Sequence, residues 1–333
     1  MKAIQIDHYA KEIHTVLREL PVPEVGSHDV LVRVKAAAVN PLELLILTGS
    51  LKALSPYKMP LTLGNECAGV VERVGSAVTA FLPGDAVYAR LPAGRIGAFA
   101  EYAAIDERAL AKLPAGYDFL TAAAIPLAGL TAYQALTEEL EAKPGQTVFL
   151  AGGSGSFGQM AVPLAKALGL RVAVSGNARA KAAVLAAGAD LYFDYRTENY
   201  WETLSGVDGV IDTLVPDAFE HEWSILKPGG RLVSLRGLPN LAFARRHRMP
   251  AAKRLLFALA GAKYDLAAKR QGKSYRFLFV RADGAQLKRV TELVEAHAIR
   301  PQTDPRVFSL EQANEALRLV ANGPTDGKVL LRV

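Results

Sequence analysis

The stretch best suited to chemistry runs from Gly152 to Gly158 and reads Gly-Gly-Ser-Gly-Ser-Phe-Gly. It follows an apolar run that ends at Ala151 and precedes a helical pattern over residues 159–168. Glycines permit a tight turn and let the backbone approach a pyrophosphate, while the free N–H groups of the next helix attract phosphate oxygens. An ordinary glycine-rich connection is the alternative. We expect this turn to bind a dinucleotide through Gly152, Ser154, Gly155, Ser156, Phe157 and Gly158.

The strand after that helix indicates which dinucleotide is bound. In NAD sites an acidic residue usually ends this strand and binds the ribose 2′-hydroxyl. Here the strand runs into Ser-Gly-Asn-Ala-Arg-Ala-Lys over residues 175–181, which contains no acid. Ser175, Arg179 and Lys181 can pair with a 2′-phosphate that a carboxylate would repel. We therefore expect NADP(H), with Asn177 in the same site. A solvated helix face is the alternative for Arg179 and Lys181.

The segments around this turn predict the architecture. Short apolar runs lie at residues 147–151, 171–175, 209–212 and 231–235 and alternate with helical patterns. This alternation predicts βαβ units and a parallel sheet, hence an α/β fold. Both ends of the chain instead show short strands between Pro/Gly turns. We expect one domain to combine residues 1–123 with 298–333, and a dinucleotide-binding domain to span residues 124–297.

Length and composition limit the class of protein. The 333 residues suffice for two domains, and no stretch holds the ~18 consecutive apolar residues of a membrane span. The N-terminus lacks a signal-peptide pattern, so we expect a cytoplasmic protein. The single cysteine, Cys67, excludes an internal disulfide and a multi-cysteine metal site. Its segment is rich in Gly and Val, which favours a small buried side chain over a nucleophile.

The net charge of +6 is concentrated in one segment. Residues 245–273 hold nine lysines or arginines and one acid, Asp265, so the basic character is local. That distribution does not describe a nucleic-acid-binding body. The centre of the segment, residues 255–259, is apolar. Three interpretations stay open: a solvated helical cover, a surface that attracts anionic phosphates or substrate, and a membrane-surface helix.

Motifs along nearly the whole chain resemble one family. They are residues 36–41 (AAAVNP), 60–71 (PLTLGNECAGVV), 83–87 (PGDAV), 97–102 (GAFAEY), 126–133 (PLAGLTAY), the glycine turn, 187–190 (AGAD) and 327–330 (GKVL). The chain thus resembles the zinc-independent quinone oxidoreductase and alkenal (enone) reductase branch of the medium-chain dehydrogenase/reductases. The resemblance implies a GroES-like β-barrel catalytic domain, a Rossmann domain with a doubly wound parallel sheet, and an active site in the cleft between them. It also implies a homodimer, extended by a strand near residues 277–280.

The resemblance assigns two candidate catalytic residues, Asn40 and Tyr57. Zinc-dependent relatives place zinc ligands at the positions of Asn40 and Asn65, and neutral amides are poor zinc ligands, so we expect no metal. Asn40 is expected beside the nicotinamide, donating to a substrate oxyanion or to the ribose. Tyr57 is expected to donate to the substrate or to cover it. The alternatives are a loop-capping amide for Asn40 and a plain loop aromatic for Tyr57.

The expected cofactor set is completed by Thr131, Tyr195, Leu235 and Phe279. By resemblance, Thr131 lies near the nicotinamide carboxamide and Tyr195 near the adenosine 2′-phosphate. A strand-end surface aromatic is the alternative for Tyr195. Two positions depart from the pattern: Pro324 stands where some relatives have an arginine, and Glu43 where many have an aspartate.

These observations predict an NADPH-dependent oxidoreductase that passes hydride to a quinone or an α,β-unsaturated carbonyl compound. A crystallin-like or regulatory protein that binds NADP(H) with little turnover is the alternative from another class. A zinc alcohol dehydrogenase is disfavoured by Asn40 and Asn65. The expected partners are the small-molecule substrate and a second copy of the chain, without nucleic acid or a membrane span.

Overall fold

Strands from both ends of the chain share one sheet, and the chain divides into two units. The computed structural model describes residues 1–214 and 218–333. Unit 1 combines Met1–Leu130 with Arg281–Val333, and unit 2 comprises Thr131–Val280. Residues 281–297 belong to unit 1 and not to the dinucleotide-binding unit as expected, because the helix α11 (Gly284–Ala296) packs against β8 (Leu110–Lys112).

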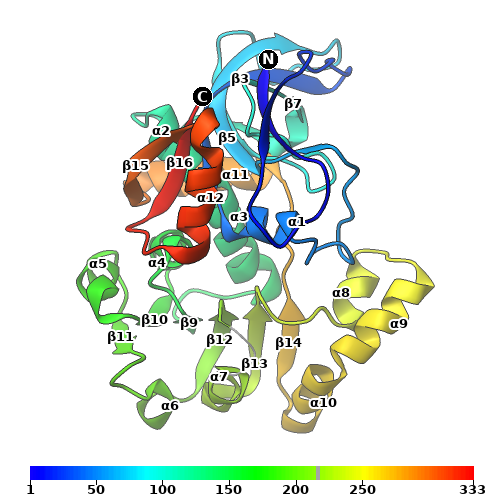
Figure 1. Cartoon of the computed structure of the whole chain (residues 1–333). Coiled ribbons are helices and arrows are strands. Elements are labelled where there is room, and N and C mark those ends of the chain that lie inside the picture. The colour runs from blue at the N-terminus through cyan, green and yellow to red at the C-terminus, as the bar shows by residue number, and fades with distance from the viewer. Residues whose placement is uncertain (215–217) are drawn as a thin grey trace. The chain divides into compact units, whose positions relative to one another are not determined.

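Unit 2 is built on a six-stranded parallel sheet (Figure 1). Its strands, in spatial order, are β11 (Leu191–Asp194), β10 (Arg171–Gly176), β9 (Thr147–Ala151), β12 (Val207–Asp212), β13 (Leu226–Ser234) and β14 (Ser274–Phe277). The central strands are apolar runs buried on both faces, as parallel sheets covered by helices require. This is the doubly wound strand order, which reverses direction beside its first strand, here β9.

Helices connect these strands and cover the sheet. They are α4 (Ser156–Ala167), α5 (Lys181–Ala186), α6 (Tyr200–Thr203), α7 (Phe219–Ile225), α8 (Leu241–Arg246), α9 (Ala251–Ala260) and α10 (Ala262–Gln271). The last strand, β14, ends at Phe277, so the strand expected near residues 277–280 lies a few residues earlier in the chain. No helix in the described residues is at once long and apolar enough to cross a bilayer.

Unit 1 is organised around a seven-stranded, largely antiparallel sheet. Its strands are β3 (Asp29–Val39), β5 (Glu66–Val74), β6 (Ala86–Arg90), β7 (Tyr102–Asp106), β8, β15 (Thr303–Ser309) and β16 (Lys328–Arg332). The chain ends meet where β16 pairs with β3, which places Leu330 opposite Ala38. A small sheet of β1 (Lys2–Ile6), β2 (Val16–Glu19) and β4 (Leu61–Thr62) completes the β structure.

Helices α1 (Pro41–Leu47), α2 (Phe119–Ala123) and α12 (Ala313–Asn322) pack on this sheet, together with α11; α3 (Pro126–Gln134) spans the unit boundary. The start of α1 matters for the site. Asn40 is its N-cap, and the Glu43 side chain accepts from the Asn40 backbone N–H in a capping box. Asn40 and Glu43 therefore lie close together in the buried region where β3 ends and α1 begins.

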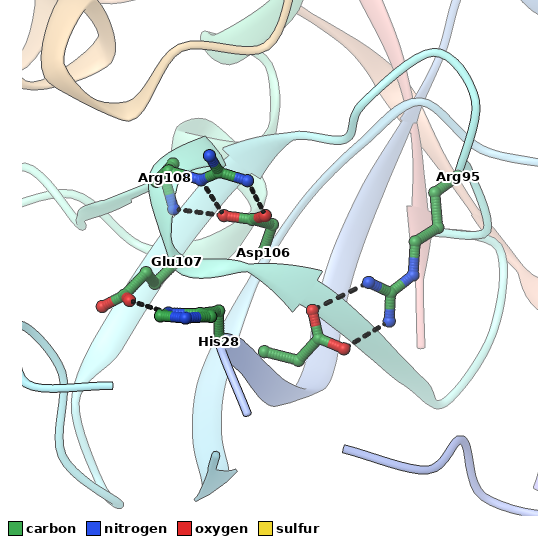
Figure 2. Close-up of polar contacts among 6 residues, drawn as sticks. His28, Arg95, Asp106, Glu107 and Arg108 are labelled. Atoms are coloured by element: carbon green, nitrogen blue, oxygen red, sulfur yellow. Dashed lines mark hydrogen bonds and ion pairs between the residues drawn. The ribbon is translucent and has the colours of Figure 1, made fainter. Parts of the chain in front are cut away.

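Ion pairs hold the loop after β6 to the start of β3. The guanidinium of Arg95, which is labelled in Figure 2, donates two hydrogen bonds, of 2.8 and 2.6 Å, to the Asp29 carboxylate. Asp29 is buried, and Arg95 holds the pKa of its carboxyl below the usual range. Bidentate geometry of this kind restrains a loop more than a single exposed contact does.

Candidate functional site

The glycine turn lies after β9, the strand beside which the sheet order reverses. Gly152 has φ +70°, which favours glycine, and a Cβ on Gly158 would lie 1.9 Å from the Gly153 carbonyl oxygen. Gly155 is the N-cap of α4, and a Cβ there would meet nothing within 4 Å. Close packing on one side and open space at the helix start fit a backbone cradle for a phosphate.

Ser175 lies at the carboxyl end of β10 and Asn177 follows that strand, at the same edge of the sheet as the glycine turn. The Ser175 hydroxyl is buried and accepts from the Gly152 N–H at 3.2 Å, so it supports the turn from within. Asn177 caps the next turn by accepting from the Ala180 N–H at 3.1 Å and donates to the Ser154 hydroxyl at 3.3 Å. Ser175 and Asn177 therefore shape the turn.

Three further residues expected at the 2′-phosphate lie on the surface of unit 2. Arg179 and Lys181 are exposed at the start of α5. Tyr195 follows β11 and is 57% exposed, with the Arg196 guanidinium over its ring. The Tyr195 backbone N–H donates to the Gly176 carbonyl at 3.1 Å, which ties this aromatic to the end of β10.

The remaining expected cofactor residues are half-buried. Thr131 lies in α3, and Ser154, Ser156 and Phe157 lie at the turn and the start of α4. Leu235 follows β13 and donates its backbone N–H to the Asp212 carbonyl at 2.9 Å, whereas Phe279 lies beyond the end of β14. All of these residues except Phe279 lie at or next to the carboxyl ends of the central strands or on α3.

Asn40 lies in unit 1, in a buried polar network. Its Nδ2 donates to the Glu66 carboxylate at 2.9 Å and to the Ala38 carbonyl at 3.2 Å. Its Oδ1 accepts from the Lys328 ammonium. Both amide hydrogens and the amide oxygen of Asn40 are therefore hydrogen-bonded within the protein. Donation to a substrate would require breaking one of these bonds.

Glu43 joins Asn40 to Asn65. One Glu43 oxygen accepts from the Asn40 backbone N–H at 2.7 Å, and the other accepts from the Asn65 backbone N–H at 3.0 Å and the Asn65 Nδ2 at 2.6 Å. Burial raises the pKa of the Glu43 carboxyl to about 7, against the lowering effect of these donors. The two positions that match zinc-ligand positions in relatives are thus bridged by one carboxyl group.

A buried ion pair completes the network. The Lys328 ammonium lies 2.8 Å from the Glu66 carboxylate, and their side chains are 4% and 0% exposed. The other Glu66 oxygen accepts from the Leu127 N–H at 2.6 Å. A paired and hydrogen-bonded charge of this kind is tolerated in a protein interior, whereas removing one partner is costly.

Arg90 and Tyr57 lie beside these groups. The Arg90 side chain is buried, donates to the Leu91 carbonyl, and leaves its Nε–H without an acceptor in the described part of the chain. Burial raises the pKa of the half-buried Tyr57 hydroxyl, while a hydrogen bond with Ser55 and the Arg90 charge act against this rise. A buried donor without an acceptor is costly and is often explained by a ligand.

Cys67 is adjacent in sequence but chemically inert. It is buried in the core of unit 1, and burial raises the pKa of its thiol to about 12. The thiolate fraction is negligible at neutral pH, so Cys67 acts as a small apolar side chain.

Known proteins share both units. A family model described as the alcohol dehydrogenase GroES-like domain matches residues 26–115, and one described as zinc-binding dehydrogenase matches residues 187–331. Human quinone oxidoreductase is 34% identical over 243 residues, covering 70% of this chain and 72% of that protein. The chain belongs to the quinone oxidoreductase family.

Two more members of the superfamily extend the similarity to the full chain. The chloroplastic NADPH-dependent alkenal/one oxidoreductase of Arabidopsis thaliana is 29% identical, covering 99% of this chain and 79% of that one. The quinone oxidoreductase structure from Coxiella burnetii aligns with a TM-score of 0.83 at 28% identity, covering 100% of this chain and 99% of that one. The expected fold, a GroES-like domain with a Rossmann sheet, is confirmed, and so is the expectation of an oxidoreductase.

Sequence reasoning missed three residues of this buried network and its surroundings: Glu66, Arg90 and Lys328. A sequence signal exists for each of them. Glu66 opens an apolar strand, Arg90 closes one at a position whose neighbours are buried, and Lys328 follows the closing Gly327. A charged residue inside an apolar strand pattern is seldom buried without a partner or a function.

Proposed function

We propose that the chain is an NADPH-dependent reductase of quinones or α,β-unsaturated carbonyl compounds that works without zinc. The proposal depends above all on the buried network of Asn40, Glu43, Asn65, Glu66 and Lys328. In that network an ammonium ion and two amides occupy the region that resembles a zinc site in relatives.

The case against zinc is electrostatic. The Lys328 ammonium contacts both the Asn40 oxygen and the Glu66 carboxylate, so the oxygen donors nearest to Asn40 are already bound to a cation. A divalent ion would have to displace that ammonium and accept neutral amides as ligands, which Zn²⁺ does poorly.

NADPH fits the residues of unit 2. The open helix start at Gly155 can receive the pyrophosphate, and the exposed Arg179 and Lys181 carry the charge that a 2′-phosphate requires. The Arabidopsis relative is named an NADPH-dependent enzyme. When bound there, NADPH would supply a hydride, and with it two electrons, for the β-carbon of the substrate.

The chain's own residues then handle the charge that develops. As the β-carbon gains hydride, the carbon–carbon π pair shifts and the carbonyl oxygen becomes an enolate oxygen. We assign stabilisation of that oxygen to the Arg90 Nε–H, a buried donor without an acceptor in the described residues, with the Tyr57 hydroxyl beside it. A proton from solvent at the α-carbon completes the reduction. Asn40 is then a positioning residue, because its amide is held by Lys328 and Glu66.

Steady-state assays test this function. NADPH oxidation should be saturable with a panel of soluble enones and quinones, and the purified enzyme should contain no stoichiometric zinc. Tight NADPH binding without turnover on any compound would favour the crystallin-like or regulatory alternative. Stoichiometric zinc would contradict the proposed chemistry of the network.

Two organisational features belong to the same proposal. We propose a homodimer joined through β14, which pairs only with β13 among the described strands and leaves a sheet edge to bond. Light scattering that gives a monomer mass would contradict it.

We also propose a cytoplasmic location, consistent with one buried, unpaired thiol and tested by cell fractionation.

A further inference from the structure

Helices α8, α9 and α10 form a separate group beside β14 in unit 2 (Figure 1). The network, the glycine turn and the cofactor residues use none of their side chains. The group is anchored by one face only. Phe243, Phe257 and Tyr264 are buried, and the Phe243 ring packs against Phe277 and Phe257.

The outer face of α9 is apolar and open. Leu255, Leu256 and Leu259 are 65%, 51% and 70% exposed, and they are spaced so that they lie on the side opposite Phe257. Leu266, on α10, is also exposed. Isolated exposed leucines are ordinary, but adjacent ones on a single helix face mark a contact surface.

Exposed cations are frequent in the same three helices. Exposed lysines and arginines in the group are Arg245, Arg246, Arg248, Arg254, Lys263, Lys269 and Arg270. The one acid in the group, Asp265, accepts from the Asn240 side chain at 2.7 Å. Arg246 is paired with Glu139. Among the described residues the other six form no ion pair, although the Lys263 ammonium lies 5.1 Å from the centroid of the Tyr264 ring.

From this pairing of features we propose that the outer face of α9, formed by Leu255, Leu256 and Leu259, binds the surface of an anionic lipid bilayer. The leucines would enter the boundary between headgroups and acyl chains, while the exposed cations contact lipid phosphates. A nucleic acid would use the cations but has no use for three exposed leucines. A protein partner would need matching acidic groups around an apolar pocket, whereas an anionic bilayer offers both properties everywhere on its surface.

The proposal stands independently of the proposed catalytic function. Where both hold, the enzyme is brought to the phase in which apolar quinones and alkenals dissolve. Failure of membrane binding would leave the reductase chemistry untouched, since that chemistry is measured with soluble substrates.

Vesicle flotation with the full-length protein tests the surface. We expect the protein to float with vesicles of mixed phosphatidylcholine and phosphatidylglycerol, and to float far less with phosphatidylcholine alone. Salt at about 0.5 M should weaken binding by screening the cations. The variant L255E/L256E/L259E should lose at least ~tenfold in partition coefficient, because buried apolar area and charge attraction fall together.

A matched variant controls for added charge. L17E/V22E/L82E replaces three exposed apolar residues of unit 1 with the same number of glutamates and should float like the wild type. Both variants should keep wild-type melting temperatures and activity with soluble enones, which shows that they fold. The proposal is overturned if the wild type does not float, if phosphatidylcholine alone binds equally, if the α9 variant floats unchanged, or if the control loses as much. Retention on RNA without vesicle binding would also overturn it.

Discussion

At the residue scale, Asn40 shows how a side chain can match a family position and have a different role. Its amide oxygen and both amide hydrogens are used inside unit 1, by Lys328, Glu66 and Ala38. An amide in this state fixes the position of its neighbours and has no donor left for substrate. Near this network, Arg90 Nε is a buried donor that has no acceptor among the described residues.

Replacing Arg90 tests that assignment. Arg90→Gln should lower kcat/KM for an enone by about a hundredfold, the usual effect of removing one oxyanion donor, while the Kd of NADPH stays unchanged. The control is Arg33→Gln, at an exposed arginine of β3. A variant that loses only stability in urea, with kcat/KM intact, would give Arg90 a purely structural role.

Glu43 predicts a pH dependence of folding. In the folded chain its carboxyl stays neutral up to a pKa of about 7, whereas in the unfolded chain it ionises near 4.5. The unfolded chain therefore binds fewer protons across this window, and stability falls as pH rises from about 5 to about 7. Glu43→Gln should remove that loss, so the variant gains roughly 2–3 kcal/mol relative to wild type between pH 5 and pH 8.

Urea unfolding at both pH values measures this difference. Glu24→Gln, at an exposed carboxyl, is the control and should track the wild type. An unchanged difference between Glu43→Gln and wild type at the two pH values would show that Glu43 is ionised throughout.

At the element scale, two glycines of the turn between β9 and α4 have different roles. Gly158 is tightly packed, whereas Gly155 faces open space. A methyl group on Gly155 would meet nothing within 4 Å, and its backbone is extended. Gly155→Ala should therefore change the free energy of unfolding by less than about 1 kcal/mol. It should raise the Kd of NADPH about tenfold or more, because the methyl enters the space proposed for the pyrophosphate.

Calorimetry and urea unfolding on the same preparation give both quantities. Gly158→Ala is the contrasting variant and should destabilise the fold, since its Cβ would lie 1.9 Å from the Gly153 carbonyl oxygen. Unchanged NADPH affinity in Gly155→Ala would place the pyrophosphate elsewhere.

We expect the cations at the start of α5 to set the cofactor preference. Arg179→Glu/Lys181→Glu should weaken NADPH binding at least ~tenfold through repulsion of the 2′-phosphate, with little effect on NADH. Lys11→Glu, an exposed cation of unit 1, should leave both affinities unchanged. Parallel losses for NADPH and NADH would mean that these cations do not distinguish the two.

At the scale of the whole molecule, a metal-free enzyme should be indifferent to chelation. We expect kcat/KM and the melting temperature to be the same before and after prolonged treatment with EDTA, and added Zn²⁺ to restore nothing. NADPH should raise the melting temperature, because at a hundred times its Kd it adds roughly 2.7 kcal/mol to the free energy of unfolding. If EDTA abolished the activity and Zn²⁺ restored it, the zinc-free proposal would be wrong and the zinc alcohol dehydrogenase alternative would be supported.

Much of this could be expected from the sequence alone. The glycine turn, the absence of an acid after β10 and the alternation of apolar strands with helices are local patterns, and they indicated a parallel sheet with a dinucleotide site. The similar textures of the two chain ends indicated that both belong to one unit, as the pairing of β3 with β16 shows. Such signals survive in sequence because strand and helix periodicities are properties of short segments.

The network required the tertiary structure. Lys328 reaches Asn40 across 288 residues of chain, because β16 pairs antiparallel with β3 and sets Val329 opposite Val39. The inward turn of Ser175, the buried Arg90 Nε and the outward face of α9 also depend on which surfaces meet. Periodicity tells which face of a segment is buried; it does not tell which side chain lies across from it, since register and packing decide that only after the chain has folded.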